Sequence, residues 1–157
     1  MKARTIYQPY ASLLAYGAKV YETTSRYIGY RGPIAIHAGL RHISSLPGGA
    51  EQEAFCALAE RIPFFNGLAH LPRGCVLATG QLIGCYRILF ANVAAHEVYY
   101  DNPKCEVANT LGVSKNELLF GDWRGGRYFL VFADIVPLPK PIPAKGQQGL
   151  WNWEMPT

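Results

Sequence analysis

The sequence has little charge and no long apolar segment. Charged residues make up 17% of the 157 positions, against about a quarter in typical soluble domains. Half of the residues are hydrophobic, which excludes intrinsic disorder as the main state. Apolar runs such as residues 128–133 are far shorter than the ~20 residues that a transmembrane helix requires. The first residues lack the apolar core of a secretory signal, so we expect a cytoplasmic protein without a membrane partner.

Cysteine is scarce, and no two cysteines form a C-x-x-C pair. The spacings do not match those of zinc sites, so we expect no metal and no cofactor. Nothing indicates an oxidising compartment, so we also expect no disulfides and interpret all four cysteines as small, mostly buried hydrophobes. They are Cys56, Cys75, Cys85 and Cys105.

Familiar catalytic and nucleotide-binding motifs are absent as well. The patterns G-x-G-x-x-G, G-x-x-x-x-G-K-[ST], H-E-x-x-H and G-x-S-x-G do not occur, so the enzyme classes that depend on them have no support. The net charge is +4 and is unevenly spread: residues 1–41 contain six basic residues and a single acidic one, Glu22. A local basic excess attracts phosphate, although a solvated basic face would give the same pattern.

The order of expected elements predicts one α+β domain (mixed α/β) over residues 1–157. We expect strands at residues 2–7, 19–24, 33–38, 74–90 and 127–138, with a last short strand within 147–154. Helices are expected from Pro9 to a stop at Gly17, over 48–61, and as short helices within 91–120. Gly80 and Gly84 allow the long strand at 74–90 to bend. We therefore predict a small curved β-barrel of five to seven strands flanked by a few helices.

Five segments carry the distinctive residues. In chain order they are Q-P-Y-A-S-L at 8–13, G-x-K-x-x-E at 17–22, Y-R-G-P-I-A-I-H-A at 30–38, G-R-Y at 126–128 and P-x-P-x-K-G-x-Q-G-L-W-x-W at 141–153. As an ordered set over nearly the whole chain, they resemble the ASCH (activating-signal-cointegrator homology) domain family. That family belongs to the PUA-like superfamily of small β-barrels.

The resemblance implies a cleft beside the G-x-K-x-x-E segment, lined by Lys19 and Glu22, that binds RNA or a nucleotide-like ligand. Some members of the family hydrolyse acylated cytidine or cleave RNA, and in such an enzyme Lys19 and Glu22 would be the catalytic pair. Two positions depart from the family pattern, because Thr24 replaces an arginine and Arg26 replaces a tryptophan. The amidohydrolases have a threonine three residues after the lysine, where this chain has Glu22. No nucleophile is therefore carried over, although Thr23 and Thr24 are adjacent.

The residues themselves also point to a polar site. Lys19 offers a point charge for phosphate, and Glu22 can accept a hydrogen bond from a base amino group or transfer a proton. Residues three apart face opposite sides of a regular strand, so the pair meets only if Lys19 lies in the turn after Gly17 or a bulge intervenes. The alternative is an ordinary surface ion pair, worth ~0–1 kcal/mol.

The remaining expected ligand-binding residues are basic, polar or aromatic. Arg31 suits a phosphate fork, and Trp123 lies in an expected loop that suits base stacking, with core packing as the alternative. Arg127 and Lys145 are expected at the edge of the cleft, whereas His37 is interpreted as a satisfied strand histidine. The full set is Gln8, Lys19, Glu22, Thr24, Arg26, Arg31, Trp123, Arg127 and Lys145.

Three functions remain open at this point: an RNA- or nucleotide-binding module, a hydrolase acting on a modified nucleoside or on RNA, and a non-catalytic interaction domain with a closed cleft. An open cleft with Lys19 and Glu22 converging in it separates the first two from the third. If Lys19 faces such a cleft, the Lys19→Ala change should abolish binding and leave thermal stability nearly unchanged.

Overall fold

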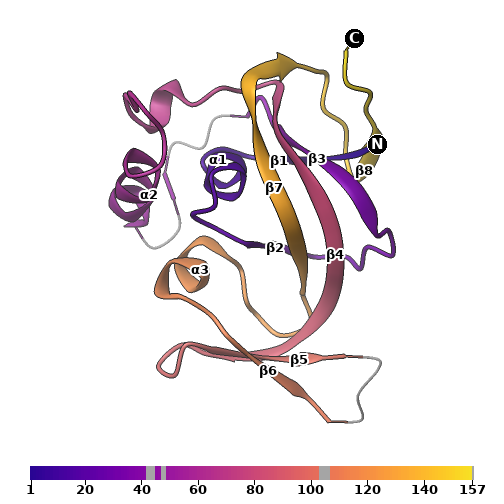
Figure 1. Ribbon diagram of the computed structural model, residues 1–157. Coiled ribbons are helices and arrows are strands. Elements are labelled where there is room, and N and C mark those ends of the chain that lie inside the picture. The colour runs from indigo at the N-terminus through magenta and orange to yellow at the C-terminus, as the bar shows by residue number, and fades with distance from the viewer. Residues whose placement is uncertain (42–44, 47–48, 103–106, 157) are drawn as a thin grey trace.

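The computed structural model describes residues 1–41, 45–46, 49–102 and 107–156 (Figure 1). Within them lie strands, three short α-helices and a 3-10 turn at Leu68–His70. In chain order the elements are β1 (Lys2–Ile6), α1 (Tyr10–Ala15), β2 (Tyr21–Thr24), β3 (Gly32–Ala38), α2 (Glu51–Ala59), β4 (Cys75–Asn92), β5 (Glu97–Asp101), β6 (Asn109–Gly112), α3 (Lys115–Phe120), β7 (Tyr128–Pro143) and β8 (Leu150–Asn152).

The strands join in one mixed, 8-stranded sheet, so the α+β class is confirmed. The main path runs β2-β7-β4-β3-β1-β8, and β5 and β6 extend it from β4. β1 and β3 are parallel, and the other pairs are antiparallel. Among the described residues β2 and β8 each have one neighbour, so the sheet is open. It also has eight strands where five to seven were expected.

The long pair of β4 and β7 gives the sheet its curvature (Figure 1). The register between them shifts between Val76 and Ala78, and twice more further along, and such irregularities bend a strand. At Gly80 the backbones are so close that a Cβ would lie 2.9 Å from the Ala133 carbonyl oxygen and 2.5 Å from the Ile135 Cδ1. The glycine expected to bend this strand is therefore required by close packing.

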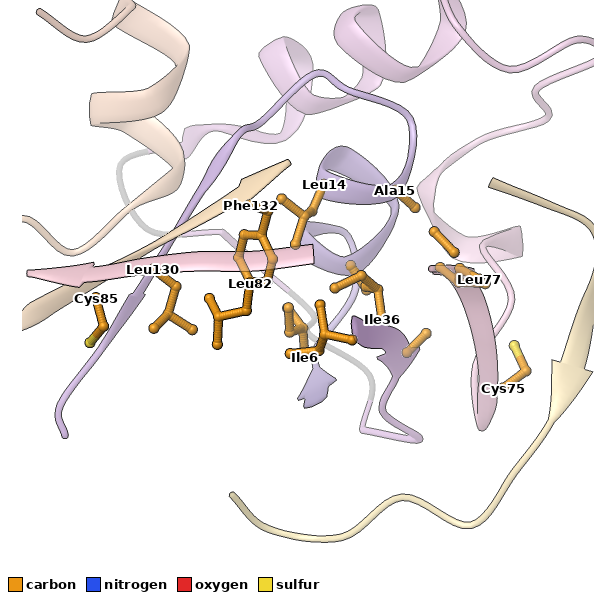
Figure 2. Packing of buried hydrophobic residues seen from close by; sticks show 14 residues of the cluster. Ile6, Leu14, Ala15, Ile36, Cys75, Leu77, Leu82, Cys85, Leu130 and Phe132 are labelled. Atoms are coloured by element: carbon orange, nitrogen blue, oxygen red, sulfur yellow. The ribbon is translucent and has the colours of Figure 1, made fainter. Parts of the chain in front are cut away.

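The main core lies between α1 and the sheet. Figure 2 shows Leu14 of α1 next to Leu82 of β4 and Phe132 of β7, with Ile36 of β3 close by. Leu14, Leu82 and Ile36 are at most 1% exposed, and burying each such side chain contributes roughly 1.5–3 kcal/mol. This packing holds α1, and the turn that follows it, against the sheet.

Residues 91–120 were expected to form short helices, but they contain β5 and β6 as well as α3. Every second side chain of β5 faces the core, and this alternation explains the difference. Val98 is fully buried, and Tyr100 packs edge-on against Phe129 of β7 with ring centroids 5.3 Å apart. A period of two is typical of a half-buried strand. β5 therefore belongs to the sheet and carries β6 with it.

The helix expected over 48–61 is α2, and it buries Ala54, Ala57 and Leu58. This spacing leaves Phe55 and Cys56 exposed. The expectation of buried cysteines is thus confirmed for Cys75 and Cys85 and wrong for Cys56, while Cys105 lies outside the described residues. None of the described helices has the length and hydrophobicity to span a membrane.

Candidate functional site

The G-x-K-x-x-E segment forms a turn between α1 and β2. Gly17 adopts a φ of +73°, a conformation that favours glycine and ends the helix. The Lys19 N–H donates to the Leu13 carbonyl at 3.0 Å, which holds Lys19 in the turn. The strand β2 begins two residues later, at Tyr21. Lys19 Nζ donates to Glu22 Oε2 at 2.8 Å and to the Tyr21 carbonyl. The prediction that Lys19 and Glu22 meet is confirmed.

The ion pair is buried, and its two members face different spaces. Lys19 is 1% exposed and Glu22 16%. Lys19 borders a small cavity of about 150 Å³ beside β7, whereas Glu22 borders a larger one between α1, β2 and α3. The expectation that both side chains line one solvent-reachable cleft is therefore wrong. The turn directs the ammonium inward, where it supports Glu22 and is out of reach of a phosphate.

Glu117 of α3 is a second buried carboxylate at this site, only 4% exposed. Ser114 Oγ accepts the Glu117 N–H at 3.1 Å, as the S-x-x-E pattern predicts. The Glu117 carboxylate does not turn back to its own helix, because Oε1 accepts the N–H of Val20 beside β2. α3 thus covers the edge of the terminal strand, which would otherwise offer unpaired backbone groups.

Burial sets the protonation of Glu117. Loss of hydration raises its pKa, while the Lys19 ammonium acts in the opposite direction. Oε2 of Glu117 is buried and has no hydrogen-bond partner in the part of the chain that the structure describes. In the sequence Glu117 stands three residues after Ser114, a spacing that predicts only a local helix cap.

The Glu22 charge acts on groups of two further elements. Burial lowers the pKa of the Arg4 guanidinium on β1, and the Glu22 charge opposes that shift. Burial raises the pKa of the Tyr10 phenol, and the Glu22 charge raises it further. Tyr10 is therefore protonated at neutral pH and can donate a hydrogen bond. Tyr10 follows Pro9 in the Q-P-Y-A-S-L segment. This place in a distinctive segment was the one sign in the sequence that Tyr10 belongs to the site.

The cavity that Glu22 borders has a volume of about 470 Å³. Pockets for small molecules typically have volumes of about 300–1,000 Å³, mostly apolar walls and a few polar groups. Here Leu119, Phe120 and Gly121 at the end of α3 form one wall. The polar lining residues are Tyr10, Glu22, Thr23, Asp122 and Arg124.

Asp122 organises the edge of this cavity. Its backbone N–H donates to Thr23 Oγ1 at 2.9 Å, and its carboxylate receives Arg124 Nε at 2.8 Å and Nη2 at 2.6 Å. Hydrogen bonding from Arg124 lowers the pKa of Asp122. Arg127 Nε lies 3.2 Å from Oδ2 as an ion pair, without the alignment of a hydrogen bond. Two guanidinium groups share one carboxylate, so the rim keeps a positive charge.

Strand register brings further arginines to the same end of the sheet. Thr24 of β2 is paired with Tyr128 of β7, and Tyr128 is also paired with Arg87 of β4. The exposed Arg26 follows β2, and Arg127 directly precedes β7, so both lie at this end.

The sequence led us to expect both Lys145 and Arg127 at the edge of the cleft, but Lys145 does not lie beside Arg127. It follows the opposite end of the 16-residue strand β7. Its proposed place at the edge of the same cleft is therefore wrong.

Gln8 and Thr24 serve the fold. Gln8 is 6% exposed; its Oε1 accepts the Ser12 N–H at 3.1 Å, and its Nε2 donates to the Pro72 carbonyl at 2.7 Å. Thr24 is 8% exposed. Both were expected to contact ligand, and neither borders the Glu22 cavity.

Trp123 was expected as an open stacking surface, but only 6% of it is exposed. Its Nε1 donates to the Glu117 carbonyl at 2.7 Å, and its ring packs against Tyr21 and Phe129. Trp123 also contributes to the wall of a neighbouring cavity. Core packing, the alternative left open by the sequence, describes it better.

Arg31 and His37 lie outside the Glu22 cavity. Arg31 is exposed, and its Nη1 donates to the carbonyls of Ile28 and Tyr30 at 2.6 and 2.7 Å. His37 is 1% exposed, and its Nε2 lies 3.0 Å from the Ala144 carbonyl, so the interpretation of a satisfied strand histidine holds for this nitrogen. Its Nδ1 has no hydrogen-bond partner among the described residues, and burial lowers the pKa of His37.

Within the described part of the chain, no group of three or more His, Cys, Asp or Glu side chains is placed to hold a metal ion. A scan of the sequence against protein-family models finds no match, and a search of curated proteins finds none either. The resemblance to the ASCH family therefore rests on the five motif segments.

Proposed function

We propose that the protein binds a nucleotide, free or within single-stranded RNA, in the cavity bordered by Glu22. The observation that carries the proposal is a carboxylate, held in place by a buried ammonium 2.8 Å away, on the wall of a cavity of about 470 Å³. The motif segments support it, because the ASCH family that they resemble is proposed to bind RNA or nucleotides. We also propose that the fold is PUA-like, and the curved, open sheet that packs against α1 is the supporting feature.

The polar groups of the cavity suit a base with an exocyclic amino group. A carboxylate accepts hydrogen bonds and donates none, so Glu22 fits the N4 amino group of cytosine and not the O4 carbonyl of uracil. The protonated Tyr10 phenol supplies a donor for a carbonyl of the same base. The apolar wall of Leu119 and Phe120 suits the flat faces of the base.

The phosphate has its partners at the rim. Arg124 borders the cavity, and Arg127 shares the Asp122 carboxylate with it. The exposed Arg26 lies at the same end of the sheet. Guanidinium groups bind phosphate through several N–H donors at once.

Hydrolysis of a modified nucleoside is the second candidate function, because Thr23 and Glu22 border the same cavity. Thr23 Oγ1 accepts the Asp122 N–H, which leaves its hydroxyl hydrogen free. Lys19, expected in a catalytic role, is buried away from this cavity and would act only by positioning Glu22. Turnover of acylated cytidine, lost in Thr23→Val, would support this function.

Binding of cytidine and uridine 3′-monophosphate, measured by calorimetry, tests the primary proposal. We expect cytidine monophosphate to bind at least about fivefold more tightly, since a correct base contact is worth about 1–3 kcal/mol. Glu22→Gln should reduce that preference, because an amide can also donate to O4. The control is Glu60→Gln, at a carboxylate whose side chain is 72% exposed on another surface. The proposal would be contradicted if the two nucleotides bound with equal affinity and Glu22→Gln left both affinities unchanged. It would also be contradicted if neither nucleotide bound at low salt.

A further inference from the structure

A second cavity adjoins the first across the loop that follows α3. Its volume is about 390 Å³, and it shares Gly121, Asp122 and Arg124 with the Glu22 cavity. From there it extends to Phe90 and Ala91 near the end of β4. The two cavities thus lie on either side of one loop, and Arg124 borders both.

The loop is held close to β4. A Cβ on Gly125 would lie 2.4 Å from the Leu89 carbonyl oxygen, so this approach needs a glycine. The Gly126 N–H donates to the Ile88 carbonyl at 2.8 Å. These contacts fix the boundary between the two cavities.

Phe90 gives the second cavity an aromatic surface. Phe90 is 54% exposed, and its ring stacks on Tyr99 of β5 with centroids 4.3 Å apart and an interplanar angle of 13°. The Tyr99 hydroxyl donates a hydrogen bond to Glu97 Oε2 at 2.9 Å, which holds the Tyr99 ring in place under Phe90. A ring supported from one side and exposed elsewhere suits stacking of a base.

Arg124 stands where a linking phosphate would pass. Its side chain is 80% exposed. The fork to Asp122 uses two of the five guanidinium N–H groups, Nε–H and one on Nη2, so three donors remain. An oriented guanidinium with free donors between two cavities fits a phosphodiester.

We propose that the second cavity binds the nucleotide next to the one beside Glu22, so that the ligand is a single-stranded RNA of at least two nucleotides. The first base contacts Glu22, the linking phosphate contacts Arg124, and the second base stacks on Phe90. This inference rests on the proposed function, because it needs a nucleotide in the first cavity.

The test compares cytidine 3′-monophosphate with two longer probes: the dinucleotide cytidylyl-adenosine, and its analogue with an abasic second ribose. We expect the dinucleotide to bind about fivefold or more tightly than the mononucleotide, and the abasic analogue to lose most of that gain. Phe90→Ala should remove the gain and leave mononucleotide affinity unchanged, whereas Phe90→Tyr should retain it. Ile83→Ala is the matched control, because Ile83 is also 54% exposed on β4 and borders neither cavity.

The outcomes separate the two proposals. If the mononucleotide binds in a Glu22-dependent way and the dinucleotide binds no more tightly, the second cavity is not a nucleotide site and the proposed function stands. A gain that survives Phe90→Ala in a folded variant also overturns the inference. If neither probe binds, the proposed function fails, and the inference fails with it.

Discussion

Lys19 is the residue on which the candidate site depends, although it does not reach the cavity. Its ammonium group is removed from water and lies against Glu22, with the Glu117 carboxylate acting on the same region. A buried charge is tolerated only when it is paired and hydrogen-bonded. Lys19 therefore positions Glu22, and its loss should be felt first as lost stability.

We predict that Lys19→Met lowers the free energy of unfolding by about 3 kcal/mol, because the change leaves a largely buried carboxylate without its partner. The sequence alone had suggested almost no effect. Chemical denaturation measures the difference, and Lys145→Met, at an exposed lysine, should stay within ~0.5 kcal/mol. Equal stabilities of the two variants would mean that the Lys19 ion pair is not buried in solution.

The raised pKa of Glu117 predicts how the stability of the protein depends on pH. Its folded-state pKa is raised above the ordinary value of 4.5, with burial as the first cause. The unfolded chain therefore loses this proton first, and stability falls as pH rises from about 4.5 to the folded-state pKa. Glutamine cannot ionise, so Glu117→Gln should gain stability relative to the natural protein as pH rises over that range. Denaturation at several pH values checks this, and a difference that is flat or decreases with pH would contradict it.

At the residue scale, the sequence predicted contacts between near neighbours and missed distant ones. The meeting of Lys19 and Glu22 followed from Gly17, which ends the helix and leaves the lysine in a turn. The contact between Glu117 and Val20 joins positions 97 residues apart. It depends on how α3 packs on the edge of β2, which no local pattern contains.

Among the elements, the pairing of β4 with β7 requires a close backbone approach at Gly80. A substitution at Gly80 tests this approach. Gly80→Ala should lower the free energy of unfolding by about 1–3 kcal/mol, because its Cβ would press on backbone and side chain of β7. Gly112→Ala, in β6, is the matched control, since a Cβ there meets none of the described residues within 4 Å. Thermal unfolding of both variants provides the comparison. An alanine tolerated equally at both sites would show that the two strands do not approach each other so closely at Gly80.

The elements that the sequence predicted well are those with a strong local signal. The long strands at β4 and β7 follow from runs of β-branched and aromatic residues, and β8 lies within the segment expected for it. β5 and β6 were missed, because Val98 and Tyr100 show their alternation only over a short stretch. The sequence predicted the helix α2 without deciding which of its faces is buried, since Phe55 suits either face of a short helix and the packing partner decides.

For the molecule as a whole, four of the basic residues considered for phosphate binding divide between the two ends of β7. Arg26, Arg124 and Arg127 lie at the end near the Glu22 cavity, and Lys145 lies beyond the other end. The sequence showed the basic excess of its first third but not this separation, because it arises from the pairing of strands distant in the chain.

That separation predicts how salt acts on RNA binding. Affinity for a short single-stranded RNA should fall as salt rises, with a log–log slope of about −0.7 for each phosphate contact. Arg26→Ala should make the slope less steep by about 0.7, whereas Lys145→Ala should leave it unchanged. Fluorescence anisotropy over a salt series measures both slopes. The opposite pattern would place the RNA at the far end of β7.

A crystal structure of the protein soaked with cytidine monophosphate tests most directly whether the cavity between α1, β2 and the end of α3 holds a nucleotide. We predict a base in that cavity with its amino group within hydrogen-bond distance of the Glu22 carboxylate, and a phosphate at Arg124 or Arg127. A nucleotide bound elsewhere, or a cavity containing only solvent at a saturating nucleotide concentration, would contradict it.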